Sequence, residues 1–131
     1  ITLGAGSRVV GPVRVGNGVT IGENVIIGPY TSIGDNCVIK SGAKIFSSSI
    51  YSGVVIGKET TVSGSILDIN TTIGDDCSIE HNTVIGPRCV LRSGITIHSG
   101  VRIWPDVIVE ENAVVKENIL NDRYDTKADG S

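Results

Sequence analysis

Aliphatic residues return at every sixth position over two long stretches of this chain. Two residues before most of them stands a small or β-branched residue, and three residues after most of them stands Gly, Asn or Asp. These last three types tolerate a positive φ angle, so each six-residue unit carries the residues of its own turn. The aliphatic positions are Leu3, Val9, Val15, Ile21, Ile27, Ile33, Ile39 and Ile45 in the first array, and Ile73, Ile79, Ile85, Leu91, Ile97, Ile103, Val109 and Val115 in the second.

A period of six fits neither of the two common elements. A helix needs apolar residues every three to four positions and a half-buried strand every two, whereas six fits a short strand followed by a turn. Three such units close a triangular coil of about eighteen residues, and successive coils hydrogen-bond at ~4.8 Å. We therefore predict an all-β fold, a single-stranded parallel β-helix of about six to seven coils and roughly 30 Å in length. A β-sandwich is the alternative, but its strands would alternate with a period of two and vary in length.

The repeat is irregular between the two arrays, over residues 46–72. No linker-like run separates the arrays, so we predict one continuous solenoid over residues 1–119 with a distorted middle. The inward positions of this middle are assigned to Ile50, Ile56, Val62 and Ile66.

Residues 120–131 form a polar and charged C-terminal tail. Just before and within it, Ile119 and Leu120 are predicted to cap the open strand edge of the last coil. Beyond about Tyr124 we expect disorder.

Charge and hydropathy exclude two classes of partner. The 131 residues include 14 acidic and 11 basic side chains, for a net charge of -3. No polybasic run is present, so we predict no nucleic-acid surface. The longest apolar runs are only a few residues, so we expect no membrane span and a cytoplasmic location. Because the sequence begins with Ile1 rather than Met, we expect a fragment of a longer protein.

Two stretches of the repeat resemble a known family. They are TIGENVIIGPYTSIGDNCVIKSG and TIGDDCSIEHNTVIGPRCVLRSGITIHSGVRIWP, and they are similar to the left-handed β-helix of the hexapeptide-repeat transferases. The middle, SSSIYSGVVIGKETTVSGSILDINTTIG, and the closing RIWPDVIVEENAVV make the chain resemble the C-terminal rod of sugar-1-phosphate nucleotidyltransferases. These are the mannose-1-phosphate guanylyltransferase and glucose-1-phosphate thymidylyltransferase-like enzymes. The resemblance covers residues 1 to about 119 and implies a left-handed coil.

The resemblance also implies where the chemistry of such an enzyme lies. In that family a Gly-rich loop with an Arg, a metal-binding aspartate and a sugar-binding lysine belong to an α/β domain. This chain has no counterpart of these motifs. The resemblance therefore implies a missing N-terminal catalytic domain that uses Mg²⁺ and a nucleoside triphosphate, and no cofactor for this segment. Acetyltransferase members carry a Tyr, Asn and Lys cluster with a His in the last coils, which HSGVRIWPDVIVEENAVV lacks.

Residues eighteen apart in the second array are expected to stack at ~4.8 Å, one coil above another. Glu80, His98 and Lys116 then form one outward column, and Arg92 and Glu110 form another. We interpret His98 beside Glu80 as a solvated charge pair worth roughly 0–1 kcal/mol. The alternative is a general base oriented by a carboxylate, as an acyltransferase needs to deprotonate its acceptor.

His81 falls in the neighbouring column, with Ser99 and Glu117. We interpret it as a surface turn residue, with the acyltransferase base as its alternative role. A zinc site of the carbonic-anhydrase kind needs three imidazoles, whereas the chain has two histidines in different columns. We therefore predict no metal site.

The three cysteines all occupy the small inward position of the repeat. Cys37 and Cys89 share a face but lie three coils apart, near ~14 Å, and Cys77 lies on another face. That separation is too large for a disulfide, so each is predicted to be a small core residue.

Trp104 follows an inward aliphatic on the outer surface, eighteen residues after Gly86. An exposed Trp above small residues is typical of a contact anchor, so Trp104 is a candidate interface residue. The alternative is a side chain that lies flat across the coil below.

These observations support three functional hypotheses. The leading one is a non-catalytic scaffold, oligomerisation or regulatory domain of a sugar-1-phosphate nucleotidyltransferase, forming a homodimer or homotrimer through a flat face of the β-helix. The second is a stand-alone acyltransferase that binds acetyl-CoA between subunits and uses His98 or His81, with Glu80, for proton transfer. The third is a structural interaction solenoid in another assembly.

Overall fold

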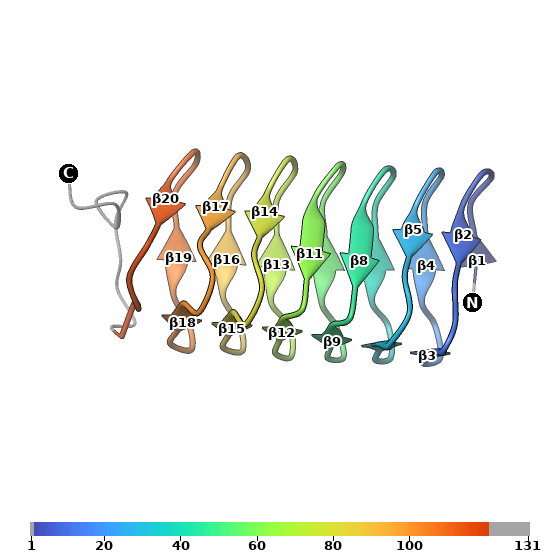
Figure 1. Cartoon of the computed structure of the whole chain (residues 1–131), viewed down its shortest axis with the longest axis horizontal. Coiled ribbons are helices and arrows are strands. Elements are labelled where there is room, and N and C mark those ends of the chain that lie inside the picture. The colour runs from blue at the N-terminus through green and yellow to red at the C-terminus, as the bar shows by residue number, and fades with distance from the viewer. Residues whose placement is uncertain (1, 121–131) are drawn as a thin grey trace.

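The computed structural model describes residues 2–120, which fold into a rod built only of short strands, turns and bends (Figure 1). The strands are β1 (Thr2–Leu3), β2 (Arg8–Val9), β3 (Val13–Val15), β4 (Thr20–Ile21), β5 (Ile26–Ile27), β6 (Thr31–Ile33), β7 (Val38–Ile39), β8 (Lys44–Phe46), β9 (Ser49–Ile50), β10 (Val55–Ile56), β11 (Thr61–Ser63), β12 (Ile66–Leu67), β13 (Thr72–Ile73), β14 (Ser78–Ile79), β15 (Val84–Ile85), β16 (Val90–Leu91), β17 (Thr96–Ile97), β18 (Arg102–Ile103), β19 (Ile108–Val109) and β20 (Val114–Val115). Over this range there is no helix that could cross a membrane.

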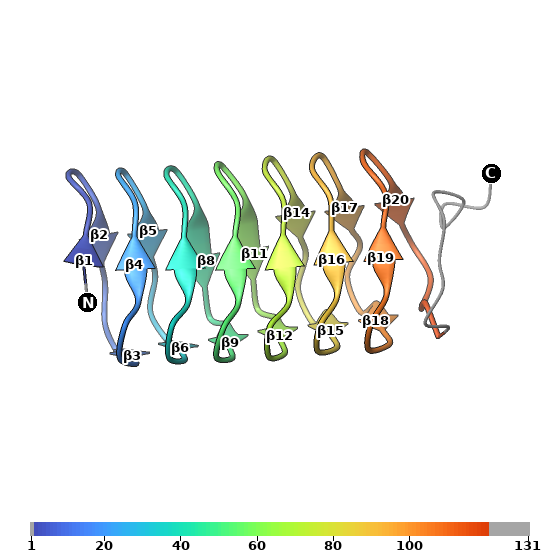
Figure 2. The same ribbon diagram turned by 180° about the vertical axis from the view of Figure 1, so that it is seen from behind.

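Every third strand joins the same parallel sheet, so the rod has three sheets (Figure 2). Sheet A has the order β1-β4-β7-β10-β13-β16-β19, sheet B the order β2-β5-β8-β11-β14-β17-β20, and sheet C the order β3-β6-β9-β12-β15-β18. In Figure 1 the chain rises at the back of each coil and descends at the front while it advances from right to left, which makes the coil left-handed. The predicted all-β parallel solenoid is therefore confirmed.

The aliphatic positions of the repeat form the core. From Ile21 onward, each of the predicted positions in the two arrays is at most 4% exposed, and Ile27 and Ile97 have no exposed surface. Burial of a side chain of this size stabilises the fold by roughly 1.5–3 kcal/mol, so the six-residue pattern supplies the main driving force.

Hydroxyl groups at the small inward position join one coil to the next. The buried Oγ1 of Thr60 donates a hydrogen bond to the carbonyl of Gly74 (2.7 Å) and accepts one from the amide of Cys77 (3.1 Å). Thr71 makes the equivalent bonds to the carbonyl of Gly86 and from the amide of Cys89. A buried hydroxyl is costly only when it lacks partners, so these positions tolerate Thr as well as Val or Cys.

The corners contain the residues with positive φ that the sequence predicts. Asn24, Asn36 and Asn82 have φ between 57° and 60°. Tyr30 (59°) and Arg88 (57°) also adopt this conformation, which is less favourable for their side chains.

The irregular middle contains two coils that are shorter by one residue. Strands β8 and β11 pair 17 residues apart, with Ile45 opposite Val62, whereas β12 and β15 pair 18 apart. The next inward residue after Val62 is Leu67, which is fully buried, and Ile66 points outward with 38% of its surface exposed. The assignment of Ile66 to the core is therefore wrong. Both short coils tighten the same corner, between sheets B and C, where Ser47 and Gly64 have positive φ.

The two ends of the rod differ. At the N-terminal end Leu3 and Val9 occupy inward positions but are 50% and 43% exposed. At the other end Ile119 is 3% exposed and forms a parallel bridge with Ile103, as predicted for a cap. Leu120 is 57% exposed and does not contribute to the cap. The prediction for residues beyond Tyr124 concerns a part of the chain outside the described residues.

Candidate functional site

The predicted column of Glu80 and His98 is present. Glu80 directly follows β14 and His98 directly follows β17, and Nδ1 of His98 lies 3.6 Å from Oε1 of Glu80. The same oxygen accepts hydrogen bonds from the amide (3.2 Å) and hydroxyl (3.4 Å) of Ser99. Both side chains are about two-fifths exposed, at 43% and 39%. In such an exposed setting the pair contributes roughly 0–1 kcal/mol to stability.

His81 lies at the next corner position and has a different partner. Its Nδ1 is 3.2 Å from the hydroxyl of Ser63, which belongs to the preceding coil. The two histidines thus have different neighbours, as their assignment to different columns predicts. Residues 2–120 contain no group of three or more His, Cys, Asp or Glu side chains arranged to hold a metal ion.

Two further ion pairs link successive coils on the surface. The pair of Arg92 and Glu110 is confirmed, with Nε 3.2 Å from Oε1. Arg88 and Asp106 form a second, which the sequence analysis missed although they are eighteen residues apart. Their contact is bidentate, with Nε to Oδ1 at 2.7 Å and a second bond of 3.1 Å. The hydrogen bond from Arg88 holds the pKa of Asp106 below its usual value, and that carboxylate raises the pKa of Arg88.

All three cysteines are buried free thiols, so the predicted absence of disulfides is confirmed. Burial raises the pKa of each thiol. Their Sγ atoms contact backbone carbonyl oxygens of the next coil, which for Cys89 is the carbonyl of Trp104 (3.1 Å). These thiols are therefore packed core groups rather than nucleophiles.

Trp104 lies on the outer surface with 53% of its area exposed. Its amide donates to the carbonyl of Ile119 (2.8 Å), which fixes its backbone to the C-terminal cap. Gly86 lies directly beneath, where a Cβ atom would stand 3.0 Å from the carbonyl carbon of Trp104. The backbone that carries the indole is therefore held close to the neighbouring coil.

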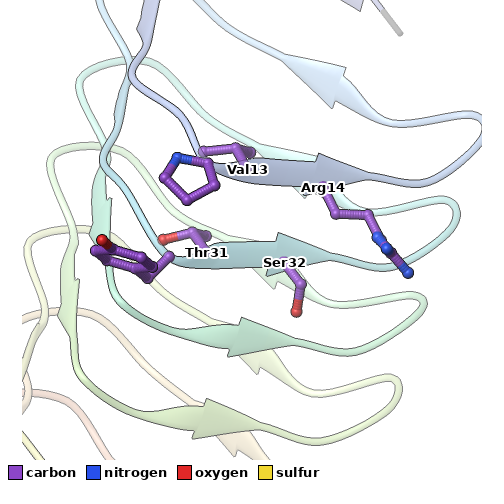
Figure 3. Close-up of a pocket in the computed structure, with 6 residues that line it drawn as sticks. Val13, Arg14, Thr31 and Ser32 are labelled. Atoms are coloured by element: carbon purple, nitrogen blue, oxygen red, sulfur yellow. The ribbon is translucent and has the colours of Figure 1, made fainter.

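A shallow hollow of about 310 Å³ lies at the N-terminal part of sheet C (Figure 3). Its walls are Pro12, Val13, Arg14, Tyr30, Thr31 and Ser32. The repeat pattern does not predict this hollow. The signal that points to it is Tyr30, a bulky residue at a corner with positive φ that is 74% exposed. The hollow is lined by no carboxylate, imidazole or thiol, so the hydroxyls of Tyr30, Thr31 and Ser32 have no base in its wall to activate them.

Comparison with known proteins agrees with the resemblance drawn from the repeat. The family model of the GMPPB C-terminal domain matches residues 9–120. Mannose-1-phosphate guanylyltransferase 1 of Arabidopsis thaliana is 31% identical over 118 residues, which cover 90% of this chain and 32% of that protein. The bifunctional protein GlmU of Lactobacillus helveticus is 34% identical over 102 residues, covering 78% of this chain and 21% of GlmU. This chain thus spans about a third or less of the curated relatives it matches.

Solved structures share the fold. GDP-perosamine N-acetyl transferase from Caulobacter crescentus, solved with CoA and GDP-perosamine, superposes with a TM-score of 0.62 at 21% identity, covering 95% of this chain and 53% of that one. The acetyltransferase domain of PglB from Neisseria gonorrhoeae gives a TM-score of 0.54 at 18% identity, covering 90% and 54%. At these identities the likeness concerns the β-helix alone.

Proposed function

This chain belongs to the GMPPB C-terminal domain family, and we propose that it is the non-catalytic scaffold or regulatory domain of a sugar-1-phosphate nucleotidyltransferase. By analogy with the plant relatives named mannose-1-phosphate guanylyltransferase, the whole protein would transfer a guanylyl group to mannose 1-phosphate. We place it in the cytoplasm, as the sequence predicts.

One observation carries the proposal: Nδ1 of each histidine faces a side chain of a neighbouring coil, and neither histidine lines the hollow beside Tyr30. Each histidine contacts a side chain one coil away, His98 with Glu80 and His81 with Ser63. The hollow beside Tyr30 has hydroxyl groups but no carboxylate, imidazole or thiol in its wall to activate them. A domain that precedes this segment would therefore supply the catalytic groups.

We propose that the cofactors of the reaction bind to that preceding domain. Mg²⁺ prefers carboxylate and phosphate oxygens in octahedral geometry. Residues 2–120 hold no cluster of three or more acidic, histidine or cysteine side chains that fits a metal ion. Mg²⁺ and the nucleoside triphosphate would thus bind outside the rod.

A rod of this kind is well suited to hold subunits together. Its faces are flat ladders of strands joined by short corners, and such faces support closed symmetric association. We propose that the chain forms a homo-oligomer, a dimer or a trimer, through one face of the β-helix.

Sedimentation velocity of the 131-residue chain tests this role. We expect a dimer or trimer at micromolar concentration, and a melting temperature that GTP, mannose 1-phosphate and acetyl-CoA leave unchanged. A ligand at 100 times its Kd would add about 2.7 kcal/mol of stability, so binding would be visible as a shift. A chain that stays monomeric over this range would contradict the scaffold role.

The contact between Glu80 and His98 favours a second candidate, a hexapeptide-repeat acyltransferase. A carboxylate 3.6 Å from Nδ1 favours a proton on that nitrogen, which leaves Nε2 as the basic nitrogen that could deprotonate an acceptor hydroxyl or amine. This candidate predicts that acetyl-CoA raises the melting temperature and that His98→Ala abolishes acetyl transfer. His81→Ala is the matched control, because its imidazole contacts a serine rather than a carboxylate.

A further inference from the structure

Exposed apolar side chains gather on one corner of the rod, where sheet C turns into sheet A. We call this surface the Trp104 patch, and it comprises Tyr51, Ile66, Ile69, Val84, Pro87 and Trp104. Trp104, Tyr51, Ile69 and Ile66 are 53%, 46%, 40% and 38% exposed, and Val84 and Pro87 are half-buried. The patch contains two of the five aromatic residues of the chain. An apolar cluster that contains a Trp and a Tyr is typical of the centre of a protein–protein interface.

The register of sheet C arranges the patch in three columns that cross four successive coils. The outward residues of the strands form the first column, since Ser49 pairs with Ile66, Ile66 with Val84, and Val84 with Arg102. The residues that follow the inward aliphatics form the second: Tyr51, Asp68, Gly86 and Trp104. The next residues form the third: Ser52, Ile69, Pro87 and Pro105. Steps of ~4.8 Å place Tyr51 about 14 Å from Trp104.

We infer that the Trp104 patch binds a second copy of this chain in an antiparallel, two-fold arrangement. This inference rests on the proposed scaffold role and names the surface and partner through which it acts. A two-fold axis across the rods, between the coils of Asp68 and Gly86, reverses the order of the coils and keeps each column opposite itself. Tyr51 of one copy then faces Trp104 of the other, Ile66 faces Val84, and Ile69 faces Pro87.

The charges fit this arrangement. Each charged residue of the four coils at this surface faces a neutral one: Asp68 faces Gly86, Arg88 faces Asn70, Arg102 faces Ser49, and Asp106 faces Gly53. The Arg102 guanidinium is also directed away from the patch, toward the carbonyls of Asn82 (2.5 Å) and Gly100 (3.1 Å). No like charges meet among these positions, and every large apolar group meets another.

A parallel arrangement of the same two surfaces is less favourable. A two-fold axis along the rod would keep each coil opposite itself and reverse the order of the columns. When that axis runs along the second column, so that each aromatic faces itself, it also places Asp68 against Asp68 of the second copy. Two carboxylates facing each other in a desolvated interface are strongly unfavourable. The geometry therefore selects antiparallel rods, and isologous contacts of this kind close as a dimer without propagating into fibres.

Ile66→Lys and Ile108→Lys form a matched pair that tests the inference. Both isoleucines point outward from a strand, with 38% and 42% exposure, but Ile108 lies in β19 of sheet A, away from the patch. By sedimentation equilibrium we expect a wild-type dimer, at least a 100-fold weaker dimer for Ile66→Lys, and no change for Ile108→Lys. Trp104→Ser should weaken the dimer as well, and circular dichroism melts confirm that each variant is folded.

Cross-linking reports the orientation. Chains carrying Ser52→Cys and chains carrying Pro105→Cys are mixed with a bismaleimide of about 10 Å reach, the usual distance between packed sheets. The native thiols are buried, so the bismaleimide reacts with the introduced cysteines. We expect covalent dimers in the mixture and none from either variant alone.

The outcomes separate the inference from the proposed function. A wild-type dimer that survives Ile66→Lys and Trp104→Ser, or a stable trimer, overturns the Trp104 patch and leaves the scaffold role intact. A wild-type monomer at every concentration overturns both.

Discussion

Leu67 and Ile66 are adjacent aliphatic residues whose truncation should have opposite consequences. Leu67 is fully buried and its strand pairs with those of Ile50 and Ile85, whereas Ile66 points outward. Leu67→Ala removes about three carbon groups, worth roughly 2.4 kcal/mol at ~0.8 kcal/mol each. The residual cavity adds to this, so the loss should reach about 3–5 kcal/mol. Ile66→Ala should cost less than about 1 kcal/mol, as surface substitutions do.

Urea unfolding followed by far-ultraviolet circular dichroism measures this difference. With m near ~1–3 kcal/mol/M for a small protein, Leu67→Ala should lower the midpoint by about 1 M or more, and Ile66→Ala by much less. The comparison needs a protein concentration at which sedimentation shows the monomer, because dimerisation would add to the apparent stability. If Ile66→Ala proves more destabilising than Leu67→Ala, then Ile66 is the inward residue and the reasoning about the short corners fails.

Three further predictions concern the core, an ion pair and the thiols. Ile27→Asp should unfold the rod, because a buried unpaired carboxylate costs several kcal/mol; a wild-type melting curve would refute the six-residue register. Since Arg88 lowers the pKa of Asp106 in the fold, their pairing contributes above the ordinary carboxyl pKa of about 3.9 and is lost as pH falls through the lower folded value. The difference in melting temperature between wild type and Asp106→Asn should therefore shrink on acidification, and one that persists at low pH would contradict the pairing. Burial and a raised pKa should keep all three thiols, Cys77 included, unreactive toward Ellman's reagent until urea is added, so prompt reaction would contradict their packing.

The side-chain contacts in the regular part of the rod are predictable because residues eighteen apart lie one above the other in successive coils. Once eighteen residues make a coil, Glu80 must lie beside His98, and Arg92 beside Glu110, and both contacts are present. The pair of Arg88 and Asp106 follows the same rule. It was missed because the corner residues were considered for their backbone conformation and not for their side chains.

In the irregular middle, the residue spacing alone does not predict which side chains are buried. Two neighbouring aliphatics, Ile66 and Leu67, fit the pattern almost equally well, so periodicity alone does not decide which one is buried. The deciding feature is the tight corner at Ser47 and Gly64, and both of its occurrences remove one residue. The hollow at Tyr30 was not predicted from the sequence for a related reason. Its shape depends on how a corner side chain lies against the coil before it.

The repeat itself indicates where a rod of this kind acquires a specific function. Closure of each coil requires inward aliphatic residues and corner residues that tolerate a positive φ. Residues of these two kinds are explained by the fold and therefore do not indicate a binding partner. After the inward aliphatic of sheet C, three coils have Gly16, Gly34 and Gly86, which need no partner. Tyr51 and Trp104 replace that glycine with large exposed aromatics, a change that the fold does not require and that hydration opposes. Because these two departures flank Ile66 and Ile69 on one corner, a common cause is simpler than separate ones, and a second copy of the same surface is the partner that accounts for both.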